Sequence, residues 1–210
     1  YFQNTHGIKA TTKVWGETIT KIVRNKIGMF GLAETNTNWT PATRSKCIIK
    51  AKQAVIEQTG TRTNLSMSTA SCSGWLGGEY QPGGTCTCAV GGWATRITKK
   101  EEDPDKLGRW CSISLQLNEE EVTFITAYRV GKAKIDIDNN KAYTQQWKQM
   151  VYKGINNPDP RKKTLEDLRK YVKHEIEQGK EIVLMMDANQ NANNRTEEMN
   201  RLECGLIDPH

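Results

Sequence analysis

Apolar positions along the chain recur with helical spacing in four places. The first helix is predicted to begin near Thr11 or Thr12, and its apolar stripe is Trp15, Ile19, Ile22 and Val23. The second is predicted to begin at Thr40-Pro41, a hydroxyl cap followed by proline, and to end at Gly60; its stripe is Ile48, Ala51, Val55 and Ile56. The third stripe is Tyr143, Trp147, Met150 and Val151. The fourth helix is predicted from Pro160 to Gly179, with Leu165, Leu168, Val172 and Ile176 inside.

Other apolar segments have the pattern of strands. Residues 27–33 and 182–186 are almost uninterrupted apolar runs, typical of strands covered on both faces. Residues 85–97, 110–117 and 122–128 alternate or run apolar, after a turn at residues 81–84, and are predicted to be sequential antiparallel strands. Helices alternating with strands at both ends predict a layered α/β sandwich, in a single domain over residues 1–210.

Charge and composition narrow the choice of partners. The formal net charge of +6 favours a polyanionic partner, because basic side chains release counterions from phosphates. No run approaches the roughly 20 apolar residues that a membrane span needs. The six cysteines lack paired spacing and no secretory signal is present, so we expect reduced thiols and an intracellular protein, nuclear or cytoplasmic.

Two of the apolar strands end in an acidic residue, Glu34 and Asp187. If the two strands are neighbours, the carboxylates converge. Mg²⁺ takes oxygen ligands and is commonly held by one or two carboxylates together with phosphate oxygens of the substrate. The pair therefore suits phosphate-ester chemistry, whereas each acid alone could simply end a strand and face water.

Four short motifs, in order, resemble those of the endonuclease/exonuclease/phosphatase superfamily. They are residues 3–7 (QNTHG), 32–36 (LAETN), 126–128 (TAY) and 187–189 (DAN). The resemblance implies a four-layered α/β sandwich of two packed mixed β-sheets flanked by helices. It implies that Glu34 and Asn4 hold Mg²⁺ or Mn²⁺, that Asp187 activates the attacking water, and that Asn189 and Tyr128 hold the phosphate.

Longer strings are similar to endonuclease domains that accompany reverse transcriptases of retroelements. These strings are residues 31–36 (GLAETN), 107–110 (LGRW) and 125–129 (ITAYR). The likeness implies a DNA-nicking role, with a reverse transcriptase domain as a candidate partner in the same polypeptide. From these strings we expect nucleic-acid contacts from Arg109, Asn36 and Arg129.

The chain departs from the superfamily pattern at three places, one of which is Arg129-Val130 after Tyr128, where a proline is common. His6 stands where Asn or Asp is usual. The closing motif, whose Asp and His complete the site, is absent, so we expect the last strands to be missing and do not assign that role to Asp208 or His210. Residues 1–3 are either the end of a strand or the scar of a cleaved tag.

Competing interpretations remain at this stage. Asp187, Asn189, Asn191 and Glu198 follow the spacing of a calcium-binding loop, but Ala192 occupies the position where such loops need glycine. For the whole chain, the alternatives to a nucleic-acid phosphodiesterase are a phosphatase of the same fold and a catalytically incomplete nucleic-acid-binding remnant. The absent closing motif favours the remnant, whereas the charge and the strings favour the nuclease.

Overall fold

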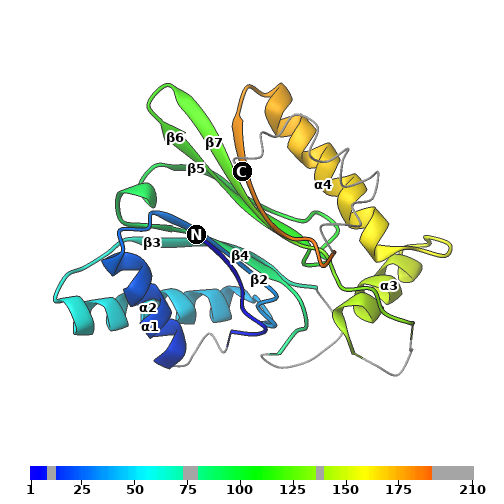
Figure 1. Cartoon of the computed structure of the whole chain (residues 1–210), viewed down its shortest axis with the longest axis horizontal. Helices are drawn as coiled ribbons and strands as arrows, with labels where there is room; N and C mark the ends of the chain where they lie inside the picture. Colours follow the sequence, from blue (N-terminus) through cyan, green and yellow to red (C-terminus); the bar gives the residue numbers. More distant parts are fainter. Residues whose placement is uncertain (9–12, 73–79, 136–139, 191–210) are drawn as a thin grey trace.

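Two four-stranded β-sheets face each other between layers of helices (Figure 1). The computed structural model describes residues 1–8, 13–72, 80–135 and 140–190. The first sheet has the order β1 (Phe2–Asn4), β2 (Met29–Ala33), β4 (Thr85–Val90), β3 (Leu65–Ala70). The second has the order β5 (Ile97–Glu102), β6 (Trp110–Leu117), β7 (Glu120–Tyr128), β8 (Glu181–Asp187). The helices are α1 (Lys13–Arg24), α2 (Pro41–Thr59), α3 (Ala142–Tyr152) and α4 (Pro160–Glu177).

Both sheets are mixed, as predicted. The pairs β1–β2 and β7–β8 are parallel, and the other neighbours are antiparallel. Helices α1 and α2 cover the outer face of the first sheet, and α4 covers that of the second (Figure 1). The predicted four-layered α/β sandwich is therefore confirmed.

Each helical layer packs a hydrophobic stripe onto its sheet. In the first layer, α1 and α2 both pack against strand residues Phe30, Leu32, Met67, Cys86 and Cys88. The helical side chains are Trp15, Ile19 and Ile22 of α1 and Cys47, Ala51 and Val55 of α2. In the second, Leu165, Leu168 and Val172 of α4 pack against Trp110, Ile125 and Ala127. The predicted caps of α2 are present, since Thr40 Oγ1 accepts from the Thr43 amide and Gly60 adopts φ 71°.

Three residues assigned to these stripes are instead exposed. Ile56, Val151 and Ile176 are 43%, 42% and 42% exposed. The buried stripe of α2 runs through Cys47, Ala51 and Val55, spaced by four, and Ile56 is the next position around the helix.

The inner faces of the two sheets meet through small and hydroxylated side chains. Thr87 Oγ1 of the first sheet lies 2.7 Å from Thr126 Oγ1 and 3.0 Å from the Cys111 carbonyl oxygen of the second. A Cβ added at Gly31 would come within 2.5 Å of Thr126 Oγ1. This close approach fixes β2 against β7, and both strands end at the same edge of the sandwich.

The segment 85–97, predicted as one strand, is interrupted. It forms β4, a 3₁₀ turn (Gly91–Trp93) and then β5 at the edge of the other sheet. Gly91 takes φ 61°, a conformation that glycine adopts at little cost, and this lets the chain cross between the sheets. The antiparallel meander β5–β6–β7 and its turn at Asn118, with φ 57°, agree with the prediction.

Several sequence-based expectations concern residues that the structure does not describe. Asn191, Ala192, Glu198, Cys204, Asp208 and His210 lie outside the described residues. Phe2–Asn4 forms a strand, in agreement with one of the two interpretations of residues 1–3. Five cysteines, at 47, 72, 86, 88 and 111, are buried free thiols.

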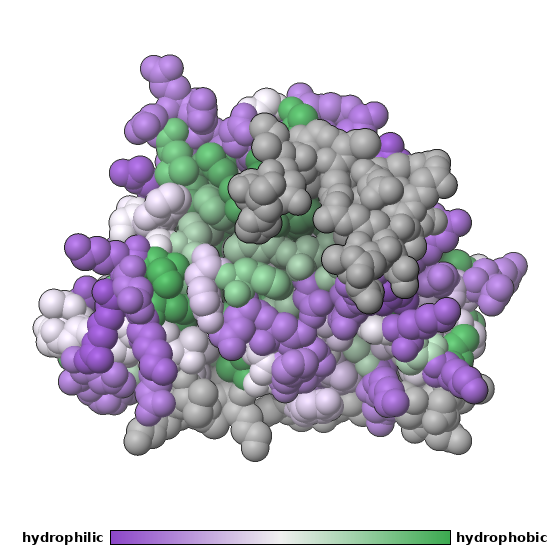
Figure 2. All heavy atoms as spheres, in the orientation of Figure 1, coloured by the Kyte–Doolittle hydropathy of each residue, from purple (hydrophilic) through white to green (hydrophobic). Residues whose placement is uncertain are grey.

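The surface over the second sheet is partly apolar. Figure 2 shows hydrophobic side chains gathered there and bordered by hydrophilic ones. Strand β8 is incompletely covered: Ile182, Leu184 and Met186 are partly buried against the cluster under α4, and Val183 is 39% exposed. Across the described ranges, none of the helices has the length and apolar character to cross a bilayer.

Candidate active site

The two carboxylates predicted to converge do so, although their strands belong to different sheets. Strand β2 lies within the first sheet and β8 in the second, so the strands are not hydrogen-bonded neighbours. Asn4, the last residue of β1, joins them: its Nδ2 donates to Glu34 Oε2 at 2.9 Å and to Asp187 Oδ2 at 2.5 Å. One amide therefore bridges two carboxylates across the sandwich.

His6 adds a group that the sequence motifs did not assign. Its Nδ1 lies 3.2 Å from Glu34 Oε2, and its backbone amide donates to Asn4 Oδ1 at 3.0 Å. The imidazole is 82% exposed. The only sequence signal for this residue was its departure from the usual Asn or Asp.

Tyr128 and Asn189 complete the group around Asp187. Tyr128 ends β7 and is paired in register with Asp187, the last residue of β8. Burial raises the pKa of its hydroxyl, the charges of Glu34 and Asp187 raise it further, and a hydrogen bond with Asn189 opposes them. The Asn189 amide donates to Asp187 Oδ1 at 3.0 Å, and its Nδ2 donates to the Arg129 carbonyl at 2.8 Å. Tyr128 is thus kept as a neutral hydroxyl beside two carboxylates.

The backbone around these side chains adopts an unusual conformation. His6, Glu34, Asn36 and Asn189 have φ of 48°, 52°, 49° and 46°. Non-glycine residues rarely occupy this left-handed region, and such residues cluster at functional sites. At Glu34 it turns the chain sharply as β2 ends, so that the carboxylate stays at the edge of the sheet.

Asn36 connects this turn to a neighbouring glycine turn. Its amide donates to the Gly83 carbonyl at 2.7 Å, and its Oδ1 accepts from the Gly83 amide at 2.8 Å. Gly83 itself has φ 81°. The predicted turn at residues 81–84 is therefore part of the site, which the sequence did not indicate.

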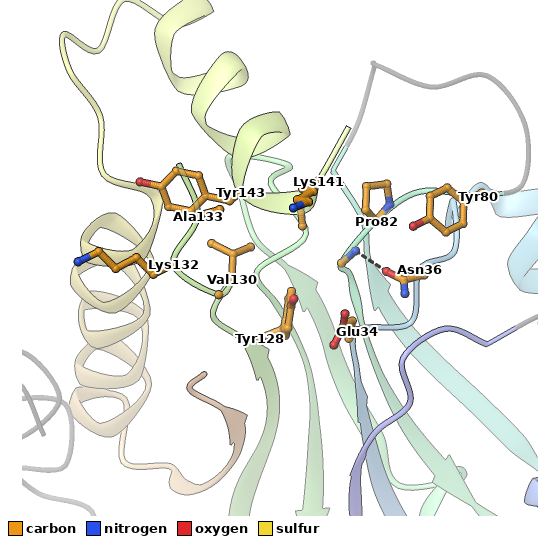
Figure 3. Close-up of a pocket in the computed structure, with 13 residues that line it drawn as sticks. Glu34, Asn36, Tyr80, Pro82, Tyr128, Val130, Lys132, Ala133, Lys141 and Tyr143 are labelled. Carbon is orange, nitrogen blue, oxygen red and sulfur yellow. Dashed lines mark hydrogen bonds between the residues drawn. The ribbon is translucent and has the colours of Figure 1, made fainter. Parts of the chain in front are cut away.

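A pocket of about 330 Å³ opens beside Glu34 and Tyr128 (Figure 3). One wall holds Asn36, Tyr80 and Pro82. The facing wall comes from residues 130–133 and 141–143 and includes Lys132, Lys141 and Tyr143. Sequence reasoning missed these lining residues; the only available signal was two lysines and a tyrosine shortly after Tyr128.

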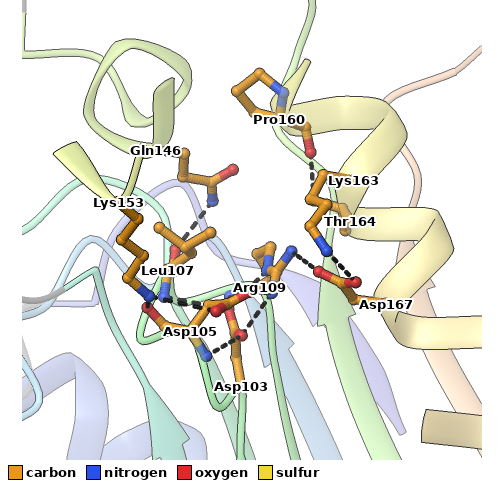
Figure 4. A network of polar contacts seen from close by, with 10 residues as sticks. All are labelled: Asp103, Asp105, Leu107, Arg109, Gln146, Lys153, Pro160, Lys163, Thr164 and Asp167. Atoms are coloured by element: carbon orange, nitrogen blue, oxygen red, sulfur yellow. Dashed lines mark hydrogen bonds and ion pairs between the residues drawn. The ribbon is translucent and has the colours of Figure 1, made fainter. Parts of the chain in front are cut away.

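Arg109, predicted to contact nucleic acid, is instead a structural residue. Its side chain is 0% exposed, and it donates from Nε and Nη2 to the two Asp103 oxygens at 2.7 Å each. Further bonds reach Asp167 at 2.8 Å and Asp105 at 3.0 Å (Figure 4). Burial alone would lower the pKa of the guanidinium, but its bonds to Asp103 and Asp167 raise it. Burial beneath α4, against Asp103, Asp105 and the sequence-distant Asp167, argues against the predicted contact with nucleic acid.

Arg129 is also buried, so its predicted contact with nucleic acid is not supported. It is 5% exposed, its Nε donates to the Arg161 carbonyl at 3.3 Å, and its Nη1 donates to Gln190 Oε1 at 2.5 Å. These bonds hold residues 187–190 beside the start of α4. Asn36 remains at the pocket.

The donor set at the carboxylates fits a hard divalent cation. Glu34 and Asp187 supply carboxylate oxygens, which suit Mg²⁺ or Mn²⁺ when phosphate oxygens and water fill the other positions. The ligand that Asn4 could offer is its Oδ1, which accepts from the His6 amide in this structure. In the described part of the chain, no three His, Cys, Asp or Glu residues are grouped to hold a metal ion. Two carboxylates with a phosphate are the arrangement that Mg²⁺ commonly uses.

Comparisons with known proteins give a fold but no close relative. No protein-family model matches the chain, and no curated protein is significantly similar to it. The human Nocturnin catalytic domain with bound sulfate is similar with a TM-score of 0.51 and 10% identity, over 94% of this chain and 64% of that one. Beta toxin from Staphylococcus aureus gives 0.51 and 12%, over 98% and 70%.

An endonuclease/exonuclease/phosphatase family protein from Leptotrichia buccalis gives a TM-score of 0.49 and 11% identity, over 97% of this chain and 70% of that one. The chain thus spans 64% to 70% of the length of these three structures. The likeness at such identities concerns the fold. With two mixed four-stranded sheets between helices, the chain shares the fold of the Nocturnin catalytic domain and of beta toxin.

Proposed function

We propose that the chain is the catalytic part of a metal-dependent phosphodiesterase that cleaves DNA. One observation carries the proposal: the Asn4 amide lies within hydrogen-bond distance of both Glu34 and Asp187, and Tyr128 is paired with Asp187 at the same edge. Two carboxylates, an amide and a neutral hydroxyl at one point can supply a general base, a cation site and hydrogen bonds to a phosphate ester.

Each residue has a role that follows from its surroundings. Glu34 and Asn4 would hold Mg²⁺ or Mn²⁺, which when bound neutralises negative charge on the phosphate. Asp187 accepts the proton of the attacking water, and its carboxylate is oriented by the Asn4 side chain and the Asn189 amide. Tyr128, kept protonated by its burial and by the neighbouring carboxylates, donates to a phosphate oxygen that Asn189 also contacts.

DNA is the proposed substrate for two reasons. The net charge of +6 favours a polyanion, and the strings at residues 31–36, 107–110 and 125–129 resemble retroelement endonuclease domains. On the same basis we propose that the domain acts beside a reverse transcriptase in one polypeptide. A phosphatase acting on a small phosphate is the main alternative with this fold.

Conversion of supercoiled plasmid to open circles tests the proposal in the full-length natural protein. Glu34→Gln and Asp187→Asn should each lower Mg²⁺-dependent nicking by about 10² or more, because each keeps the shape and removes a charge. Glu166→Gln, on the exposed face of α4, is the matched control and should nick normally. Chelation by EDTA should stop nicking, and added Mg²⁺ should restore it.

The variants must remain folded for the comparison to count, and far-UV circular dichroism checks this. Undiminished nicking by Asp187→Asn would refute its role as the base. Binding of DNA with a normal salt dependence but no nicking by the unchanged protein would favour the remnant. Hydrolysis of small phosphomonoesters with no action on DNA would favour the phosphatase.

A further inference from the structure

His6 lies beside Glu34 on a loop that is hydrogen-bonded to the end of β2. Its Nδ1 is 3.2 Å from Glu34 Oε2. The His6 amide donates to Asn4 Oδ1 at 3.0 Å, and the next amide along the chain, that of Gly7, donates to the Glu34 carbonyl at 2.9 Å. These bonds place the imidazole next to the carboxylate that is proposed to hold the metal ion.

The contact between His6 and Glu34 contributes little to the stability of the fold. The imidazole is 82% exposed, and water screens the charges of exposed ion pairs. His6 also adopts φ 48°, a left-handed backbone conformation that costs free energy in any residue with a Cβ. A residue that is held in such a conformation for so small a gain in stability is typical of a functional position.

The separation of the two side-chain atoms suits joint coordination of one ion. Two ligand atoms bonded to the same divalent ion at about 2.1 Å, at right angles to each other, lie about 3 Å apart. The 3.2 Å between His6 Nδ1 and Glu34 Oε2 is close to that value. Asn4 presents its Nδ2 to Glu34 and Asp187, and an N–H donor cannot ligate a cation. The His6 ring nitrogen is therefore well placed to act as a second protein ligand next to Glu34.

A ring nitrogen among the ligands changes which ions a site prefers. Mg²⁺ takes oxygen ligands and gives up its water reluctantly, whereas imidazole nitrogen is a favoured ligand of transition-metal ions. We infer that His6 ligates the divalent ion together with Glu34, and that it shifts the preference of the site from Mg²⁺ toward transition-metal ions. The inference rests on the proposed phosphodiesterase function and specifies the metal of that site.

Isothermal titration of the full-length natural protein with Co²⁺ and with Mg²⁺, in the absence of substrate, tests the preference. His6→Asn should keep the loop, because asparagine tolerates a left-handed backbone. It should weaken Co²⁺ binding by about tenfold or more, the scale on which metal sites lose affinity when a supporting group is removed, and should change Mg²⁺ binding little. His174→Asn is the matched control, because His174 is exposed on α4, and it should bind both ions normally.

Ligation itself has a separate measurement. In the protein loaded with Mn²⁺, electron spin echo envelope modulation detects the nitrogen nucleus of an imidazole that is bonded to the ion. We expect nitrogen modulation in the unchanged protein and in His174→Asn, and its loss in His6→Asn. Far-UV circular dichroism checks that both variants are folded, so a lost signal reports the missing ligand.

The outcomes separate the two proposals. Bound Mn²⁺ without nitrogen modulation, or Co²⁺ and Mg²⁺ affinities that respond equally to His6→Asn, would overturn the role of His6, even if the protein nicks plasmid. Nitrogen modulation that depends on His6, with a selective loss of Co²⁺ affinity, in a protein that does not cleave DNA would support the ligand and refute the nuclease. A protein that binds none of these ions would overturn both proposals.

Discussion

Replacing Arg109 by methionine should destabilise the protein strongly without changing which ligands it binds. The guanidinium and Asp103 are both 0% exposed, and the arginine makes four side-chain bonds to Asp103, Asp105 and Asp167. Methionine fills the space of the stem but leaves the Asp103 carboxylate buried without its cation. Removing one partner of a buried pair costs about 3–5 kcal/mol, because the other charge remains uncompensated.

Urea denaturation followed by circular dichroism measures this loss directly. Thermal unfolding gives a second measurement. For a chain of this length, each kcal/mol of lost stability lowers the melting temperature by about 2–4 °C, so we expect the melting temperature to fall by roughly 6–20 °C. Lys153→Met is the control: it removes an exposed ion pair with Asp105, 3.3 Å long, whose removal should cost at most about 1 kcal/mol. If Arg109→Met loses less than about 1 kcal/mol, the buried pairing does not stabilise the fold as argued. If it stays folded but loses DNA affinity, Arg109 has the contact role that its burial argues against.

Two further predictions concern stability. Gly31→Ala should destabilise the protein by about 1–3 kcal/mol, because the added Cβ would lie 2.5 Å from Thr126 Oγ1. The control is Gly92→Ala, whose Cβ meets nothing within 4 Å and which should be nearly neutral. Equal urea midpoints for the two variants would contradict the close approach of the sheets. Burial raises the pKa of the Cys72 and Cys111 thiols from 9.0 to about 12. As the pH rises, the unfolded chain therefore loses these protons before the folded protein does. The free energy of unfolding should fall between pH 9 and 12, by about 1.4 kcal/mol per pH unit for each thiol. Cys111→Ala should show a shallower fall in urea midpoint over this pH range than the unchanged protein, and an identical slope would refute the assignment.

Local signals explain why most helices and strands could be predicted. The cap at Thr40 and the glycine at residue 60 act within a few residues, so the sequence alone specifies both ends of α2. The interruption after β4 depended instead on which sheet receives the next strand, and periodicity does not carry that information. Strand β3, with the sequence LSMSTA, was not predicted because its small polar residues become buried only against the second sheet.

The residues of the site show the same difference between local signals and long-range packing. Glu34 and Asp187 could be found because each follows an apolar strand abruptly, and strand ends are local features. The burial of Arg109 could not, because one of its partners, Asp167, is 58 residues away and only the packing of α4 brings it near. Likewise, nothing in the residues around Tyr80 indicated that the segment after Tyr128 would face it.

The left-handed backbone at His6, Glu34, Asn36 and Asn189 has a consequence for engineering this protein. Each such conformation costs a non-glycine residue about 1 kcal/mol or more, which glycine at the same place would recover. A screen for heat resistance would therefore tend to enrich substitutions at these four positions, and those substitutions would remove side chains that build the carboxylate site and the pocket beside it. Libraries meant to yield a more robust and still functional protein should keep these positions fixed and vary the outer faces of α2 and α4 instead.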